Sequence, residues 1–248
     1  MKNPVTTTKA FCDTDKKRAN TKTSIIIILG IMAGIYSTIG CYGAQVAQLY
    51  SHNRLIASLV FPIGGILTTC CGGTLFTGNL LMSIGYKNGN ISFKELLRYL
   101  FLAYIANFFG AIFLSVFVYL TGINNPELRD IIIDTAVNKA SLSPVSIIFR
   151  SILCGILVNL GAWLSYAGDD LNEKVLGVFF PNMLYYLCGF EHCIANIYFL
   201  AIAMFISRQI TLPLFFYNII LSTIGNIIGG AFIVALGYWR VFVKESTD

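Results

Sequence analysis

The sequence predicts an all-α integral membrane protein whose six transmembrane helices form two inverted repeats of three helices each. Three observations predict this fold: an apolar composition, six apolar stretches of membrane-spanning length, and short motifs that recur in the same order in both halves of the chain. Hydrophobic residues make up 56% of the 248 residues and charged residues only 12%. Because a soluble domain carries about 25% charged residues, water is the wrong solvent for most of this surface.

The apolar stretches define the predicted helices. They lie near residues 24–50, 55–86, 94–122, 144–167, 173–207 and 211–239. A helix crosses a bilayer in about 20 apolar residues, so the longer stretches leave room for tilt or for an internal break. We divide the chain into a basic N-terminal segment (1–23), a first three-helix repeat (24–122), an outer connecting loop (123–143), a second three-helix repeat (144–239) and a C-terminal tail (240–248).

Basic residues gather on one side of the predicted membrane. Of the 17 Lys and Arg residues, 12 fall in the N-terminal segment, in or next to the connections after the second and fourth helices, and in the C-terminal tail. The positive-inside rule then places both termini in the cytoplasm. The abundance of Ile, Lys and Asn indicates a bacterium, and hence its cytoplasmic membrane. The net charge of +5 reflects anchoring to membrane lipid rather than binding to nucleic acid.

The first 23 residues are polar and basic. They lack the short apolar region and the small-residue cleavage site of a signal peptide. We expect an amphipathic helix that lies on the inner leaflet, with a disordered tail as the alternative.

The internal repeat is clearest in the second and fifth stretches. Cys71–Asn79 and Cys188–Asn196 both begin with Cys-Gly and end with a small residue followed by Asn, at the same spacing. Each half holds three spans, an odd number, so the second half must start on the opposite side of the membrane. Such inverted repeats place a substrate path near the midplane. Two further pairs of similar segments occur in the same order in the two halves: Gly34–Gly40 with Gly155–Gly161, and Asn107–Gly110 with Asn226–Gly229.

The second and fifth helices are predicted to be broken inside these motifs. Gly72, Gly73 and Gly189 tolerate backbone geometries that a helix forbids, and Pro62 and Pro181 loosen the turns before them. Non-helical backbone survives at membrane depth only where protein or a water-filled cavity satisfies it. We therefore expect the two breaks to line a pore, with tight helix kinks at a packing interface as the alternative.

Glu191 and His192 are the most informative side chains, because two adjacent ionisable residues lie inside an apolar stretch. Charges at membrane depth are costly and are rarely kept without a use. Histidine exchanges a proton near neutral pH, although a structural histidine is the alternative. Glu191 is interpreted as structural, accepting hydrogen bonds from freed amides or orienting a neighbour. Thr77 occupies the matching motif and is expected to face His192.

Asn79 and Asn196 follow the two breaks, and we interpret both as bracing the loops through hydrogen bonds to freed backbone. Lys139, in the outer loop, is a candidate for attracting anions electrostatically, or is an ordinary solvated lysine. Phe61, Leu75 and Tyr185 lie near the breaks and are either constrictions of the path or core residues.

Enzyme chemistry is not indicated. The seven cysteines show no CxxC spacing, which favours packing roles over metal ligation. No nucleotide loop, metal-ligand cluster or nucleophile–base pair is present in the sequence, so we expect no cofactor, no metal and no catalytic residue.

These motifs resemble those of the formate/nitrite transporter family over nearly the whole chain. Leu75–Asn79 resembles the motif of that family's second helix, and Gly189–Asn196, with its Glu-His-Cys-Ile-Ala-Asn string, resembles the motif of its fifth helix. The region from Leu153 to Tyr166 resembles its fourth helix. The resemblance implies an aquaporin-like six-helix protomer, assembled as a homopentamer with one pore in each protomer.

The resemblance also implies a function and roles for named residues. It implies passage of small monovalent anions such as formate, nitrite, lactate or hydrosulfide. Thr77 and His192 would be the central polar pair, Lys139 the vestibule lysine, and Leu75, Phe61 and Tyr185 the constrictions.

One departure bears on the substrate. Many members have an asparagine where this chain has Gly155 and a cysteine where it has Asn159. Residues four apart share a helix face, so we expect Asn159 to replace the missing amide one turn away and the space near Gly155 to be enlarged. In this respect the chain resembles the hydrosulfide-channel branch, and hydrosulfide is the leading substrate on the sequence alone, with formate and nitrite as further candidates.

The expected mechanism is that of a channel for weak-acid anions. Crossing an apolar constriction as a bare anion costs much desolvation energy. Proton sharing with His192, stabilised by Thr77, would let the species cross as a neutral acid or as a well-solvated anion. A proton-coupled secondary transporter that uses Glu191 and His192 as a relay is one alternative, and a neutral-solute pore is the other.

Overall fold

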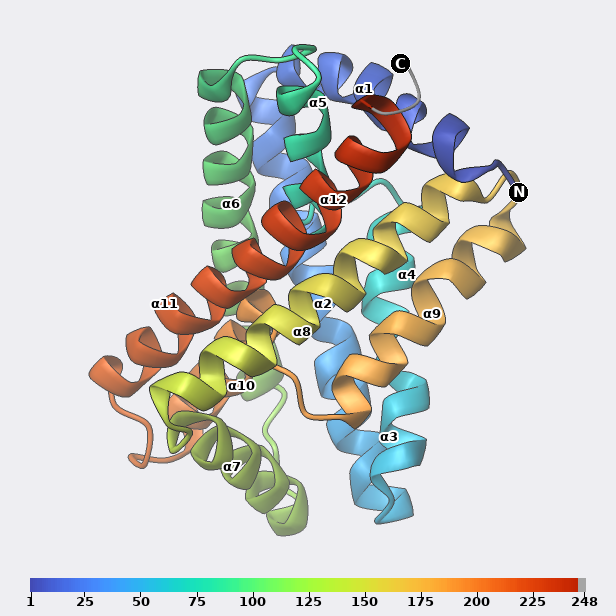
Figure 1. Ribbon diagram of the computed structural model, residues 1–248. Coiled ribbons are helices and arrows are strands. Elements are labelled where there is room, and N and C mark those ends of the chain that lie inside the picture. The colour runs from blue at the N-terminus through green and yellow to red at the C-terminus, as the bar shows by residue number, and fades with distance from the viewer. Residues whose placement is uncertain (245–248) are drawn as a thin grey trace.

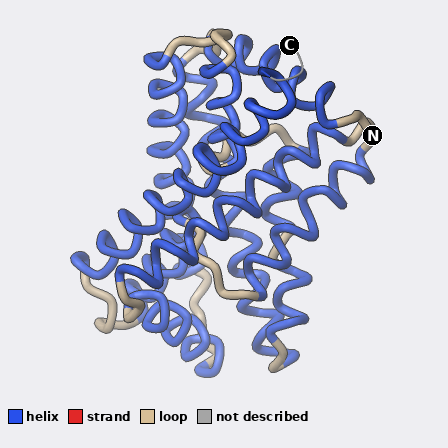
Figure 2. The backbone as a smooth tube through the Cα atoms, viewed as in Figure 1, coloured by secondary structure: helices blue, strands red, loops and turns tan. Residues whose placement is uncertain are grey.

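The computed structural model describes residues 1–244, and over that range the chain is a bundle of helices joined by loops, without a strand (Figure 1; Figure 2). Helix α1 (Pro4–Ala19) lies at one end of the bundle, in contact with the last described helix, η3 (Arg240–Lys244). Helix α7 (Pro126–Ala140) lies at the opposite end. We refer to these as the α1 end and the α7 end.

Four helical runs in the described part are long and apolar enough to cross a membrane. Three are the single helices α2 (Thr23–Ser51), α6 (Phe93–Leu120) and α8 (Pro144–Ala167). The fourth comprises α11 (Leu212–Ile227), the π-helical η2 (Ile228–Ala235), α12 (Leu236–Trp239) and the π-helical η3.

Two further runs are interrupted. The first comprises α3 (Arg54–Val60) and α4 (Ile63–Cys70), leaves helical geometry, and resumes in the short helices η1 (Gly78–Met82) and α5 (Ser83–Lys87). The second comprises α9 (Leu171–Leu187) and α10 (Cys193–Ile206). Gly72 (φ 81°) and Gly189 (φ 70°) take up the left-handed backbone conformation that favours glycine. Both interruptions fall inside the two segments where the sequence predicts breaks.

A buried asparagine holds each interruption in place. Asn107 on α6 accepts a hydrogen bond from an amide of the first interruption and donates to carbonyl oxygens of that interruption and of α2. Asn226 on α11 makes the matching three contacts with the second interruption and α8. The six bonds, with lengths of 2.7–2.9 Å, join Asn107 to Phe76 N, Gly30 O and Thr74 O, and Asn226 to Cys193 N, Ser151 O and Glu191 O.

The N-terminal segment differs from the expectation that it lies on a lipid leaflet. It does form a helix, α1, but its apolar face packs on protein. Phe11 is 1% exposed, stacks on Tyr166 at 4.1 Å between ring centroids, and joins a core cluster with Leu81, Ile84 and Trp163. A helix whose apolar face is covered in this way has little left to insert into lipid.

The outward face of the bundle is apolar. Helix α6 alone exposes Phe101, Phe109, Phe113 and Phe117. Contiguous apolar surface of this kind is rare on soluble monomers and marks contact with a membrane or with other chains.

Candidate functional site: a path between the two ends of the bundle

Two large cavities and a small one between them form a path through the protein. The cavity at the α7 end has a volume of about 290 Å³ and the cavity at the α1 end about 320 Å³. A constriction of about 20 Å³ shares Phe61, Tyr185 and His192 with the first of them. It shares four other lining residues with the second: Gly65, Leu75, Val158 and Asn182. The three spaces therefore adjoin, and the constriction is the narrow middle of one path.

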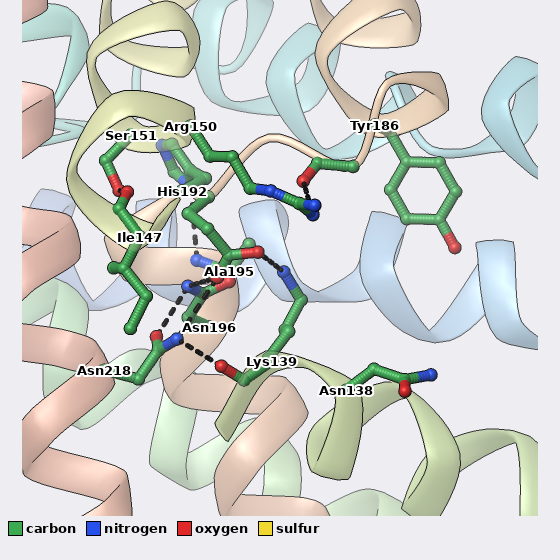
Figure 3. Close-up of polar contacts among 12 residues, drawn as sticks. Asn138, Lys139, Ile147, Arg150, Ser151, Tyr186, His192, Ala195, Asn196 and Asn218 are labelled. Atoms are coloured by element: carbon green, nitrogen blue, oxygen red, sulfur yellow. Dashed lines mark hydrogen bonds and ion pairs between the residues drawn. The ribbon is translucent and has the colours of Figure 1, made fainter. Parts of the chain in front are cut away.

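Lys139 lies on the α7-end cavity and forms an ion pair. Its Nζ donates to Glu191 Oε1 at 2.9 Å, and only 15% of the lysine side chain and 2% of the glutamate side chain is exposed. The second carboxylate oxygen accepts hydrogen bonds from Asn196 Nδ2 at 2.6 Å and Asn218 Nδ2 at 3.3 Å. Figure 3 shows the side chains of Lys139, Asn196 and Asn218 gathered around this group, with dashed lines for their hydrogen bonds. Of the two roles expected for Glu191, these contacts fit the orientation of neighbouring side chains and not the acceptance of hydrogen bonds from freed backbone amides.

The α7-end cavity carries surplus positive charge. Its lining holds Arg54, Lys139 and Arg150 against the single carboxylate of Glu191, and Lys139 is paired with that carboxylate. Arg54 donates to Tyr186 O at 3.1 Å and Arg150 donates to Gly189 O at 3.3 Å, at the C-terminal end of α9. Because both arginines bond neutral carbonyl oxygens, their charges are not neutralised and attract anions into the cavity.

His192 is held in one orientation at the constriction. Its Nδ1 accepts a hydrogen bond from the Ala195 amide at 3.1 Å, which caps α10. Since a backbone amide can only donate, Nδ1 carries no proton and the imidazole is neutral with its proton on Nε2. Nε2 lies 2.8 Å from Thr77 Oγ1 and donates to it. The structure thus brings Thr77 and His192 together, with Thr77 fully buried behind the histidine.

Aromatic and aliphatic side chains form the wall of the constriction. The Tyr185 ring stacks on His192 at 5.7 Å and meets the Phe61 ring edge-on at 5.2 Å. Leu75, from the first interruption, and Val158, from α8, complete the apolar part of this wall. Phe61, Tyr185 and Leu75 therefore lie where the sequence suggested constrictions.

The loop residues have separate contacts. Asn79 Nδ2 donates to Leu75 O at 2.6 Å and so braces backbone of the first interruption. Asn196 contacts the side chains of Glu191 and Asn218 instead of freed backbone. Gly72 and Gly73 line the α1-end cavity, and Gly189 lines the α7-end cavity.

Asn159 and Gly155 are not placed as expected. Asn159 is fully buried, donates to Gly155 O at 2.8 Å, and does not line any of the three cavities described above. A Cβ on Gly230 of η2 would overlap its amide nitrogen. A Cβ on Gly155 would meet Asn226 O at 2.5 Å, so this glycine allows close helix packing and opens no space. Both residues are on the face of α8 that packs on the last helical run.

The sequence did not single out several residues of the path. Arg54 and Arg150 are recognisable in the sequence only as charges outside the membrane, and their position beside α9 depends on the tertiary fold. Ser37, Gly65, Val158 and Asn182 also line the constriction. Ser37 and Val158 lie within the repeated segments Gly34–Gly40 and Gly155–Gly161 but were not singled out there, and Gly65 and Asn182 belong to no motif. Within residues 1–244, no group of three or more His, Cys, Asp or Glu side chains is arranged to hold a metal ion.

The apolar outer surface, the membrane-length helices and the row of adjoining cavities are the features of a membrane transport protein. A family model for formate/nitrite transporters matches residues 5–240, and the chain belongs to this family.

Named relatives agree with this assignment. The chain is 29% identical over 270 residues to a "Probable formate transporter" of Methanothermobacter thermautotrophicus, covering 99% of this chain and 98% of the relative. It is 33% identical over 230 residues to the "Uncharacterized transporter YrhG" of Bacillus subtilis (89% and 86% covered). It is 28% identical over 216 residues to the "Formate channel FocA" of Escherichia coli K12 (78% and 75% covered). These relatives are channels and transporters, not enzymes.

Solved structures share the fold. An "FNT family ion channel" superimposes with a TM-score of 0.88 at 24% identity, covering 94% of this chain and 98% of that chain. A "Pentameric formate channel with formate bound" has a TM-score of 0.81 at 26% identity, covering 89% and 98%.

Proposed function

We propose that this protein is a channel for small monovalent weak-acid anions, with formate and similar oxyanions such as nitrite as its leading substrates. The observation that carries the proposal is the row of adjoining cavities: two of about 290 and 320 Å³ flank one constriction beside His192 and share lining residues with it. The net positive lining of the α7-end cavity supports an anionic substrate. The small constriction limits that substrate to a few atoms.

Passage through the constriction requires new hydrogen bonds, because an anion must leave most of its water behind there. The neutral His192 offers its Nε2 proton, which now points at Thr77. An anion that takes the place of the Thr77 oxygen receives this hydrogen bond, and sharing of the proton moves the species toward the neutral acid. Conduction also requires that the anion bind weakly enough to be released. A neutral donor meets this requirement better than a fixed positive charge, which would bind the anion too tightly.

Formate takes precedence over hydrosulfide for two reasons. The features that favoured hydrosulfide, Gly155 and Asn159, lie in a packed helix interface and add no space to the path. The relatives with a stated substrate are named for formate. Hydrosulfide remains a substrate to be tested rather than the leading one.

The membrane arrangement follows from the same evidence. We infer two inverted three-helix repeats, supported by the matching contacts of Asn107 and Asn226 and by the paired backbone geometry at Gly72 and Gly189. The excess of basic residues in the segments near the α1 end supports a cytoplasmic α1 end in a bacterial inner membrane. The α7-end cavity then opens to the outside. The likeness to a pentameric formate channel supports a homopentamer with one path in each protomer.

The experiment is an anion panel in proteoliposomes that contain the purified protein. Formate, nitrite, hydrosulfide, chloride and glycerol are presented one at a time, with and without a proton gradient. The proposal predicts that formate and nitrite enter down their own gradients, faster than chloride and glycerol. Accumulation of formate against its gradient, driven by protons, would instead identify a coupled transporter. Glycerol or water entry without anion entry would identify a neutral-solute pore.

A further inference from the structure

Asn182 lies at the narrowest part of the path. It shares one face of α9 with Val178 and Tyr185, since residues three and four apart lie on the same side of a helix. Val178 lines the α1-end cavity, Tyr185 lines the constriction and the α7-end cavity, and Asn182 lies between them on both the constriction and the α1-end cavity. One stripe of α9 therefore follows the path, and Asn182 is its polar member in the middle.

The side-chain amide of Asn182 has no hydrogen-bond partner among residues 1–244, although the residue is only 8% exposed. Three buried asparagines of the bundle, Asn107, Asn226 and Asn218, each make three hydrogen bonds. Asn159 and Asn196 each leave only the side-chain oxygen without a partner. The amide of Asn182 is absent from the side-chain atoms that are both sealed and unpartnered, and the residue lines the constriction and the α1-end cavity. Its hydrogen-bonding groups are therefore available to water or to a solute that occupies the path.

Gly65 makes room for this amide. A Cβ on Gly65 would overlap Asn182 Nδ2 and would meet Val178 Cγ1 at 3.0 Å, so the amide lies against the wall at Gly65. Gly65 borders the same two spaces as Asn182. The spacing along the chain between Gly65 and Asn182 equals that between Gly72 and Gly189. Gly65 and Asn182 therefore occupy matching positions of the two halves. Asn182 supplies the polar group, and Gly65 leaves the space for it.

Ser37 provides a second unused polar group at the constriction. It is 7% exposed, and its hydroxyl also makes no hydrogen bond within the described chain. His192, by contrast, has both ring nitrogens engaged, by Thr77 and by the Ala195 amide. Asn182 and Ser37 can therefore donate a hydrogen bond to a solute in the constriction without first breaking a bond within the protein.

We propose that Asn182 and Ser37 form an anion-binding site at the α1 side of the constriction, and that this site selects small oxyanions over hydrosulfide. The proposal rests on the proposed channel function and deepens it. A carboxylate or nitrite oxygen is a strong acceptor for an amide N–H, and the bond is strengthened by the charge. Sulfur is a weaker acceptor. A space of about 20 Å³ admits about one water-sized group, so the anion reaches this site nearly dehydrated and depends on these donors.

The test compares formate and hydrosulfide entry into proteoliposomes that contain wild type, Asn182→Leu or Asn138→Leu. Leucine preserves the bulk of asparagine and removes its donors. Asn138 is the matched control, because it lines the wide α7-end cavity and is exposed. Loss of a hydrogen bond to a charged group predicts about a tenfold or larger fall in formate entry. We expect hydrosulfide entry to fall much less in Asn182→Leu, and the ratio of the two rates to stay at the wild-type value in Asn138→Leu.

A formate-to-hydrosulfide ratio in Asn182→Leu within about twofold of wild type would overturn the proposal, given the size of the expected effect. Asn182→Asp gives a second test with almost no change in shape. Its carboxylate repels anions at neutral pH, and we expect formate entry, corrected for protein-free vesicles, to recover as acid protonates it into a donor. Entry that does not differ from wild type at any pH would contradict the site. Absence of formate entry in the wild type would instead contradict the proposed channel function itself.

Discussion

Glu191 is a carboxylate that is almost closed to solvent and is neutralised by Lys139 at 2.9 Å. Removing one partner of a buried ion pair leaves an uncompensated charge and costs about 3–5 kcal/mol. We therefore expect Lys139→Met to lower the melting temperature in detergent strongly. Glu191→Gln added to Lys139→Met should recover much of the loss. Arg129→Met, on the same helix but exposed, is the control and should change little. Equal melting temperatures for Lys139→Met and Arg129→Met would contradict the structural role of the pair.

His192 combines two functions that a substitution can separate. Asparagine at this position can still cap α10 by accepting from the Ala195 amide, but it lacks the Nε2 proton. We expect His192→Asn to fold and assemble normally, to conduct formate about tenfold or more slowly, given the loss of a hydrogen bond to an anion, and to lose the wild-type pH dependence. Unchanged pH dependence of flux in His192→Asn would show that this proton is not shared with the substrate.

The residues of the path were only partly predictable from the sequence. Glu191 and His192 stand out because adjacent ionisable side chains in an apolar stretch are costly. Asn182 gives no such signal, since one asparagine beside a proline also fits a loosened helix turn. Asn159 was predicted to lie on the path because it shares a helix face with Gly155. The two residues do share a face of α8, but that face packs on α11 and η2. The direction in which a helix face points depends on its neighbours, which a single sequence does not reveal.

At the scale of elements, the docking of α1 depends on pH through Asp15. Burial raises the pKa of the Asp15 carboxyl from 3.8 to about 6, and the Arg18 guanidinium at 3.3 Å opposes this rise. The docked helix therefore holds a proton more tightly than the undocked one. Docking is strongest below pH 3.8 and weakens as the pH rises through about 6.

Hydrogen exchange of residues 4–19 measures this docking. We expect amide protection in α1 to fall by about tenfold or more between pH 5 and pH 8, after correction for the intrinsic exchange rate. Asp15→Asn should keep α1 docked from pH 5 to pH 8, because the amide does not ionise. A Cβ on Gly85 would meet Asp15 Oδ2 at 2.5 Å, so Gly85→Ala should undock α1 at every pH. Protection in the wild type that does not change with pH would contradict the role of Asp15.

The long and the interrupted helices follow from local rules, and tertiary contacts determine the rest. The breaks at Gly72 and Gly189 were predictable because only glycine takes this backbone geometry freely. The outer connecting loop was predicted without a helix, yet 15 of its residues form α7. Asn125 caps this helix and Pro126 begins it, which is a recognisable start signal. The docking of α1 on protein, by contrast, depends on an apolar surface that is formed by segments far away in the chain.

At the scale of the whole molecule, the exposed apolar surface indicates that the bundle does not exist alone in water. Part of it faces lipid, and the proposed pentamer covers another part. Native mass spectrometry from mild detergent should therefore give a particle of about five times the 27.3 kDa chain mass. A monomer that conducts formate with the same rate per chain would contradict the pentamer and leave the path within each protomer intact.

The central claim is that anions cross each protomer through the constriction beside His192. The most direct measurement is formate entry into proteoliposomes with wild type, Val158→Trp and Val145→Trp. Val158 lines the constriction, where the larger ring fills a space of about 20 Å³, whereas Val145 is exposed on the same helix. We predict formate entry in wild type and Val145→Trp, and a fall of about tenfold or more in the folded, assembled fraction of Val158→Trp, because the indole ring blocks the desolvated anion. Entry through Val158→Trp at the wild-type rate, or no entry in the wild type, would contradict the account.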